Sequence, residues 1–240
     1  MDQNTFWKLI DTVNAAVPHG DHDAILRETK KALCDRNVED ILDWALIMDQ
    51  YKQAAYRNDL WAASAAMGAH YSDDGFIDFR YWLISCGRKT YMDALRDPDS
   101  LADVDVTGED LNFELFGYVA NDAYRQKTAP AQRGEDHDVC AMYDRLNTYK
   151  LAPQTIAEIQ AELPQRPDIG WDWTEYELPK LFPRIHAQKM KHGDLAARWK
   201  SCWNVGTWST PMSMRGANVK NTYFQNLPKT LHPLSAAIPT

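Results

Sequence analysis

The sequence predicts an all-α fold: a compact multi-helix domain followed by an irregular C-terminal tail. Three observations favour this fold. Apolar residues recur every three or four positions through most of the chain, capping residues precede these runs, and no alternating run reaches the length of a β-strand. We assign residues 1–193 to the helical domain. Residues 194–240 are expected to hold a short helix and then an irregular segment rich in Ser, Thr, Asn and Pro.

The clearest helix is predicted over residues 73–86. Ser72 is a suitable N-cap because its hydroxyl can accept a hydrogen bond from a first-turn backbone N–H, and the acids Asp73 and Asp74 follow at the positive end of the helix dipole. Apolar residues then recur at steps of three and four, at Phe76, Phe79, Leu83 and Cys86. Gly87 is expected to end the helix in the left-handed conformation.

Four helices are predicted before this one, over residues 4–17, 24–33, 37–55 and 58–67. Asn4 is expected to cap the first of them, and Asn37 with Asp40 resembles a capping box at the start of the third. Gly68 is expected to end the fourth. Because only three residues then precede Ser72, the fourth helix and the central one should be antiparallel or sharply angled neighbours.

After Gly87 the helical spacing resumes over residues 88–96, 107–123, 138–149, 153–163 and 178–192. Asp97 can cap a short turn that begins at Pro98, and Pro183 should kink the last helix. Residues 128–138 are polar and interrupted by Pro and Gly, which indicates a linker.

Composition argues against several classes of function. The formal charge of −8 is unsuited to a nonspecific nucleic-acid surface, which needs a basic field. No run approaches the roughly 18 apolar residues of a membrane helix, and the first residues lack the apolar stretch of a secretory signal. We therefore expect a cytoplasmic protein that binds neither nucleic acid nor membrane.

No metal site is predicted from the cysteines or the histidines. The cysteines at 34, 86, 140 and 202 are widely separated and form no CxxC pair, so reduced thiols are expected. The loop at residues 19–23 holds two His and two Asp, but nothing in the sequence fixes their geometry. A second His-Asp pair, at 137–138, also falls beside a loop. The sequence identifies neither a cofactor nor an oligomeric state.

The central helix carries the candidate functional residues. Arg80 lies two turns beyond Asp73, which is too far along a helix for a direct ion pair. We therefore expect Arg80 to pair with a carboxylate on a neighbouring helix, with Trp61 and Trp82 shielding it from water. The complete candidate ligand site comprises Trp61, His70, Asp73, Asp74, Arg80 and Arg88.

Three interpretations of these residues stay open. The first is a binding or regulatory module for a protein or peptide partner, in which Trp61, Trp82 and Arg88 anchor the partner. The second is a hydrolase-type enzyme. In that case Asp73 or Asp74 is the base or a metal ligand, and Arg80 and Arg88 stabilise an anion. The third is purely structural: the acids cap a helix, and His70 is a hydrogen-bonded residue at a corner between helices.

Several segments carry a resemblance to a known family. They include Asp59-Leu60-Trp61-Ala62-Ala63, Ser72-Asp73-Asp74-Gly75-Phe76, Phe79-Arg80, Trp82-Leu83-Ile84, Gly87-Arg88 and residues 97–103. In these segments the chain resembles a bacterial family known as Domain of Unknown Function 4240, and the resemblance covers most of residues 1–190. It implies no activity. Some relatives adjoin tryptophan-glycine-arginine domains, similar to regulators of molybdate metabolism, which associates the family with regulation.

One departure from the family pattern limits what can be transferred. Members often carry small residues and a cysteine just before the Ser-Asp-Asp sequence, where this chain has Ala69-His70-Tyr71. No role for a thiol at that position is therefore expected here.

Overall fold

A computed structural model of the chain describes residues 1–69, 72–106, 110–128 and 140–191. Within these ranges the regular elements are all helices and no strand is present, so the all-α prediction is confirmed. The predicted tail at 194–240 and almost all of the predicted linker at 128–138 lie outside the described residues. The division of the chain at residue 193 therefore stays a prediction.

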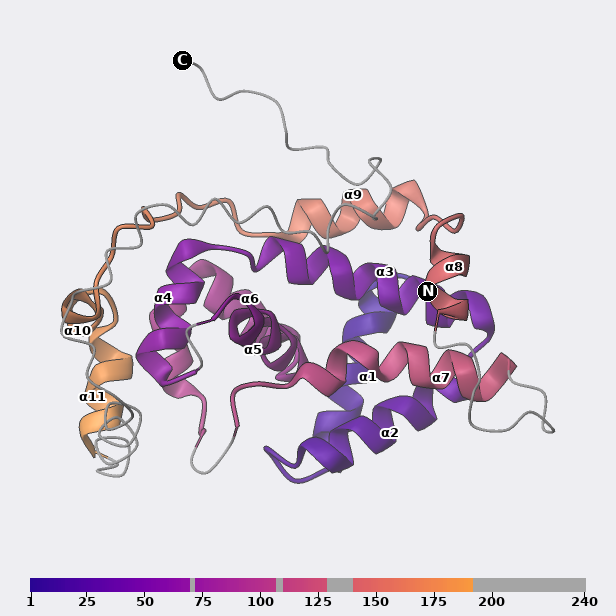
Figure 1. The fold of residues 1–240 in the computed structure, drawn as a ribbon, viewed down its shortest axis with the longest axis horizontal. Coiled ribbons are helices and arrows are strands. Elements are labelled where there is room, and N and C mark those ends of the chain that lie inside the picture. The colour runs from indigo at the N-terminus through magenta and orange to yellow at the C-terminus, as the bar shows by residue number, and fades with distance from the viewer. Residues whose placement is uncertain (70–71, 107–109, 129–139, 192–240) are drawn as a thin grey trace, which may run out of the picture.

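Helix α5 (Asp73–Ser85) lies at the centre of the fold (Figure 1). Around it pack α3 (Val38–Ala54), α4 (Asn58–Met67), α6 (Arg88–Arg96) and the 3-10 helix η2 (Glu114–Tyr118). The Ser72 hydroxyl accepts a hydrogen bond from the Gly75 N–H at 3.0 Å, and Gly87 has a φ of 94°. The predicted start of the central helix is therefore confirmed. Gly87 does follow its end with a positive φ, but its ψ of 168° means that the expected left-handed helical conformation is not adopted.

The N-terminal helices pack on one side of this centre. Helix α1 (Gln3–Ala16) contacts α2 (His22–Cys34), and α2 in turn packs against α7 (Val119–Thr128). Aromatic rings fill the space between α1, α3 and α6. The centroids of Phe6 and Trp44 are 4.4 Å apart, and those of Trp7 and Tyr51 are 4.6 Å apart. Large buried rings of this kind dominate the apolar area removed from water on folding.

The last described part of the chain runs along the outside of these helices (Figure 1). It contains α8 (Ala141–Leu146), α9 (Pro153–Glu162), the 3-10 helix η3 (Glu175–Glu177), α10 (Leu178–Leu181) and α11 (Pro183–Lys191). Helix α9 contacts α1, whereas α10 and α11 contact α4. We call the irregular segment between α9 and η3, residues 163–174, the connector.

A carboxylate supplied by another element begins α11. Asp99, in the 3-10 helix η1 (Pro98–Asp103), accepts hydrogen bonds from the backbone N–H groups of Arg184 and Ile185, each at 3.0 Å. These first-turn groups have no partner within their own helix, so a buried acid from η1 satisfies them. The contact fixes the end of the described chain against the central helices.

Several predicted boundaries were wrong. Asp2, not Asn4, caps α1, because the Asp2 carboxylate already accepts a hydrogen bond from Thr5 N–H at 2.7 Å. His22 and Asp23 belong to α2 rather than to the preceding loop. The helix expected over 107–123 is replaced, in its described part, by a loop, then η2, then α7, and the Phe113 N–H bonds to the carbonyl of Asp78 at 3.2 Å.

Prolines and glycines set other ends as expected. Gly68 follows α4 with a φ of 92°. The helix expected over 178–192 is interrupted at Phe182, directly before Pro183, so the predicted kink is a complete break between α10 and α11.

Candidate functional site

Arg80 is buried, with 3% of its surface exposed, and its partners are backbone carbonyls and rings. Its guanidinium donates to the carbonyl of Lys52 at 2.9 Å and to that of Phe76 at 3.3 Å. It also lies over the rings of Tyr56 and Phe76, at 4.9 and 5.1 Å from their centroids. Helix α3 ends at Ala54, so the Lys52 carbonyl is one of the last four, which lack a partner inside the helix.

The expectation that Arg80 pairs with a carboxylate is wrong for the part of the chain that the structure describes. No carboxylate lies within 4.0 Å of its guanidinium there. Burial lowers the pKa of Arg80, because removing a cation from water disfavours its charged form. The negative end of the α3 dipole and the two ring faces stabilise that charge instead. Arg80 is thus a cap for the end of α3.

The two rings that contact this arginine belong to a larger group of packed rings, which we call the aromatic cluster: Tyr56, Trp61, Phe76 and Trp171. Trp61 stacks on Phe76 with ring centroids 4.7 Å apart, and Trp171 meets Trp61 edge-on at 5.0 Å. Tyr56 lies 6.3 Å from Trp171. Trp61 is only 6% exposed, whereas Tyr56 is 53% and Trp171 48% exposed. The cluster therefore has a buried base and an open outer side.

Acidic side chains lie beside the aromatic cluster. Asp73 and Asp74 are exposed in the first turn of α5, and within the described residues neither makes a hydrogen bond or ion pair through its side chain. Asp73 precedes Phe76 by three residues, so the two share a helix face. Residues 167–177, which include Trp171, contain no Lys or Arg and four acids: Asp168, Asp172, Glu175 and Glu177. Two of the segments that contribute rings to the cluster are therefore acidic in sequence.

A buried carboxylate joins the connector to the start of α4. Asp59 is 2% exposed and accepts a bidentate pair of hydrogen bonds from Arg57, at 3.1 and 2.8 Å. Arg166 of the connector also donates to it. In return, Asp168 accepts hydrogen bonds from the backbone N–H groups of Asn58 and Asp59, at 2.8 and 3.0 Å. In this contact between the connector and α4, each carboxylate and each guanidinium interacts with a group of opposite charge or with the N-terminus of α4.

Arg88 belongs to a different contact. Its guanidinium donates to Glu162 and, at 3.4 Å, to Asn4, while its backbone N–H donates to Asp11 at 3.2 Å. The buried Tyr51 hydroxyl donates to the other oxygen of Glu162. Burial, and then the bond to this carboxylate, raise the pKa of Tyr51 far above its usual range.

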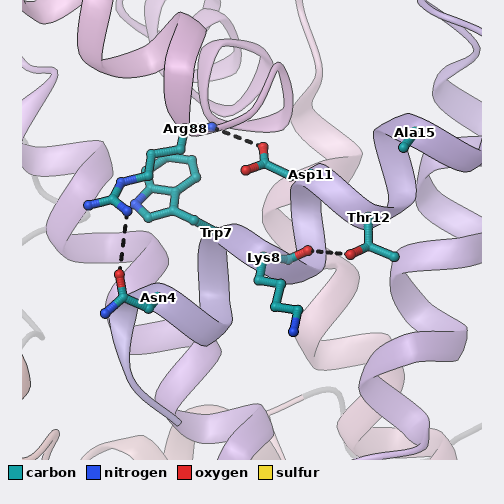
Figure 2. A pocket seen from close by; sticks show the side chains of 7 residues that line it. All are labelled: Asn4, Trp7, Lys8, Asp11, Thr12, Ala15 and Arg88. Carbon is teal, nitrogen blue, oxygen red and sulfur yellow. Dashed lines mark hydrogen bonds between the residues drawn. The ribbon is translucent and has the colours of Figure 1, made fainter.

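A shallow pocket lies beside Arg88 (Figure 2). It has a volume of about 460 Å³ and is lined by six α1 side chains and by Arg88. In Figure 2 the Arg88 side chain lies against the Trp7 indole and reaches toward Asn4. The indole N–H of Trp7 is buried and faces the Tyr51 oxygen, without meeting hydrogen-bond geometry. The pocket is open to solvent and its polar groups mainly bind one another.

Two of the predicted site residues contact the same ring in the structure. Trp61 and Arg80 both contact Phe76, and Asp73 and Asp74 begin the helix that carries it. Arg88 does not join them. Helix α5 is 13 residues long, which is about 20 Å at 1.5 Å per residue, and Arg88 follows its opposite end.

Two other expectations need correction or stay untested. Trp82 is completely buried in the core, so it cannot anchor a partner at the surface. His70 lies outside the described residues. Across the described ranges, no three His, Cys, Asp or Glu side chains gather where they could hold a metal ion. No described helix is both long enough and apolar enough to pass through a lipid bilayer.

Comparison with known proteins matches residues 1–126 to the family described as Protein of unknown function (DUF4240). The chain belongs to this family. No curated protein and no solved structure is detectably similar to it. The DUF4240 match contains α1 to α6 and most of α7, and therefore both Asp59 and Trp61. Arg166 and Trp171 lie beyond the match, so the aromatic cluster of this DUF4240 chain combines matched helices with a later segment.

Sequence reasoning missed Tyr56 and Trp171, the two exposed members of the cluster. A usable signal for Trp171 was present: two tryptophans in the acidic loop Trp171-Asp172-Trp173, where a ring is not needed for helix packing. Tyr56 had no such signal, because a tyrosine directly after a helix can be a buried core residue as easily as an exposed binding residue.

Proposed function

We propose that this chain is a binding module that recognises a basic segment of a protein partner at the aromatic cluster. The observation that carries the proposal is the half-exposure of Tyr56 and Trp171 above the buried Trp61 and Phe76. Exposed aromatic groups of this kind mark interaction surfaces more often than chance, and Tyr and Trp are enriched among residues that dominate binding energy.

The charge around the cluster supports a cationic partner. Asp73, Asp74 and Asp172 are exposed, and the whole chain carries a formal charge of −8. A Lys or Arg side chain over a Trp or Tyr face contributes roughly 0.5–2 kcal/mol, and nearby carboxylates add attraction at long range. The same acidity would repel nucleic acid. A protein segment rich in Arg or Lys therefore suits this surface best.

The rigidity of the site supports binding rather than accidental exposure. Trp61 and Phe76 stack beneath the exposed rings, and Arg80 fixes Tyr56 and Phe76 relative to the end of α3. A preorganised aromatic surface loses little conformational entropy when a partner binds.

The hydrolase alternative has less support from the geometry. It needs an acid and two arginines around one reacting group, but Arg88 lies at the far end of α5 from Asp73, and Arg80 is turned toward a helix end. An aspartate that serves as general base must lie within hydrogen-bond reach of the reacting proton and close to its electrostatic partners.

A fluorescence-anisotropy titration tests the proposal. The probe is a labelled nine-residue peptide of alternating Arg and Gly, and its control replaces every Arg with Glu. We expect wild type to bind the Arg peptide with a Kd of roughly 10–100 µM at low salt, weakening as salt rises. Trp171→Ala should weaken binding at least about 5-fold, as expected for loss of about 1 kcal/mol or more at a central aromatic residue.

The matched control is Tyr176→Ala. Tyr176 is 95% exposed, close to Trp171 in the chain and outside the cluster. It should bind the Arg peptide like wild type. Equal binding of the Arg and Glu peptides, or equal losses in Trp171→Ala and Tyr176→Ala, would refute the proposed site.

A further inference from the structure

Trp171 lies in a segment whose backbone makes no regular secondary structure. The connector, residues 163–174, therefore depends on side chains of other elements for its position. Arg57 donates to the carbonyls of Arg166 and Pro167, at 3.2 and 3.0 Å, and the Asn58 amide donates to that of Ile169 at 2.8 Å. All these donors lie at the start of α4.

Asp59 holds the arginine among these donors. Its buried carboxylate holds Arg57 in a bidentate pair, which fixes the guanidinium that in turn holds two connector carbonyls. The same carboxylate binds Arg166 of the connector directly. A planar guanidinium held at two points presents its remaining N–H groups in fixed directions. Loss of the Asp59 charge would thus disturb both connections at once.

The ring of Trp171 rests on the same helix. Its edge-on partner, Trp61, follows Asp59 by two residues in α4. The carboxylate contact and the ring contact are therefore rigidly related through one short stretch of helix. Because Asp168 also caps this helix through Asn58 and Asp59 N–H, the connector and the helix start stabilise each other.

We propose that Asp59 is a positioning residue that seats Trp171 in the binding surface through Arg57 and Arg166. Its consequence for binding rests on the proposed function, whereas the seating of Trp171 is a property of the chain alone. The basic partner touches the aromatic rings; Asp59 itself is buried and never meets it. The surface therefore requires both the DUF4240 part of the chain and a connector that carries an arginine for Asp59.

The experiment uses the full chain labelled with 5-fluorotryptophan. The ¹⁹F resonance of Trp171 is assigned from the line that Trp171→Phe removes. In wild type this resonance should be displaced from that of solvated fluorotryptophan, because the ring lies against Trp61. In Asp59→Asn it should move toward the solvated position, and affinity for the Arg peptide should fall by about the same factor as in Trp171→Ala, about 5-fold.

The matched control is Asp103→Asn. Asp103 also pairs with an arginine from later in the chain, Arg184 at 2.6 Å, but this pair is exposed and joins η1 to α11 instead of the connector to α4. The control should leave both the resonance and the affinity unchanged. Arg166→Gln provides a second test if Asp59→Asn folds poorly, because Asp59 then keeps its bidentate partner Arg57. It should shift the Trp171 line in the same direction.

The outcomes separate the two proposals. An unmoved Trp171 line in Arg166→Gln and in folded Asp59→Asn would overturn the positioning role, whatever the peptide does. A moved line with unchanged peptide affinity would overturn the link from Asp59 to binding. A moved line in a protein whose wild type binds no Arg peptide would support the seating of Trp171 and refute the proposed function.

Discussion

The guanidinium of Arg80 donates a hydrogen bond to the backbone carbonyl of Lys52, 2.9 Å away, at the end of α3. A buried cation thus has a helix terminus and two aromatic faces as its partners, in the part of the chain that the structure describes. The arrangement stabilises the charge without burying a carboxylate, and it joins α5 to α3 beneath the aromatic cluster.

This role predicts which substitutions are costly. Arg80→Ala should lower the free energy of unfolding by about 2–4 kcal/mol, because it leaves a cavity and an unsatisfied carbonyl. Asp49 is not in contact with Arg80, but its negative charge acts on Arg80 from a distance. Asp49→Asn should lower the free energy of unfolding by less than about 1 kcal/mol, because the ion pair of Asp49 with Lys52, at 2.9 Å, lies near the surface. Urea unfolding measures both. Similar losses in the two variants would show that Arg80 depends on an ion pair after all.

Two glycines with positive φ should respond differently to alanine. Gly68 has φ 92° and ψ 19°, in the left-handed helical region, whereas Gly87 has φ 94° and ψ 168°, a conformation that residues other than glycine rarely adopt. A Cβ at Gly68 would meet only Lys189 Nζ at 3.9 Å, whereas a Cβ at Gly87 would lie 2.5 Å from an Asp11 carboxylate oxygen. We expect Gly68→Ala to cost about 1 kcal/mol from backbone strain alone and Gly87→Ala about 2–3 kcal/mol. Thermal and urea unfolding of the two variants check this, and equal losses would contradict both the greater backbone strain at Gly87 and the close approach of Asp11.

Lys189 makes stability depend on pH. Burial lowers the pKa of Lys189 to about 8, whereas in the unfolded chain it should be near 10.5. Between these values the unfolded chain binds the extra proton, so the free energy of unfolding should rise with pH. The full effect of such a pKa difference is about 3 kcal/mol, and partial exposure reduces it to about 2 kcal/mol.

The measurement compares wild type with Lys189→Met at pH 7 and pH 9.5. The variant should be more stable by about 2 kcal/mol at pH 7, and about half of this difference should disappear at pH 9.5. The range stops below pH 10 because burial raises the pKa values of Tyr51 and Tyr91, so their ionisation in the unfolded chain lowers stability above that pH. A difference that does not change with pH would show that Lys189 titrates normally.

Glu162 joins α9 to the core through a buried hydroxyl. Glu162→Ala leaves Tyr51 without its acceptor and should cost about 2–3 kcal/mol, while Glu162→Gln keeps an acceptor and should cost about 1 kcal/mol. Tyr51→Phe removes the stranded hydroxyl, so adding it to Glu162→Ala should restore about 1 kcal/mol. Simple additivity of the two single losses in urea unfolding would mean that the hydroxyl and the carboxylate do not interact.

Local signals predicted the helices well where a cap or a glycine defined a boundary. Ser72, Asn37 and Gly68 act as expected because capping involves residues three or four positions apart, which the sequence shows directly. Asn4 was misassigned because Asp2, two residues earlier, offers the same chemistry. The helix predicted in the segment before α7 was wrong for another reason. The backbone of that segment bonds to Asp78 on α5, and apolar periodicity does not reveal such a partner.

The candidate site was predicted only in part. Trp61 and Arg80 do approach each other through Phe76, because Phe76 and Arg80 lie one turn apart on a helix that packs beside Trp61. The predicted partner of Arg80, a carboxylate, was wrong. Its actual partner is a backbone carbonyl at a helix end, and such a carbonyl has no signature in the sequence. Arg88 was grouped with them because it is near in sequence, but the length of α5 separates it from the first turn.

The sequence by itself determined the all-α class, the central helix with its cap and its end, and the family, because these depend on short-range spacing and on residue identity. Only the tertiary structure decided that Arg80 caps α3, that Asp59 joins α4 to the connector, and that Trp171 completes an exposed aromatic surface. These contacts join residues far apart in the chain. Side-chain geometry, burial and helix termini select them, and none of these is encoded in local periodicity.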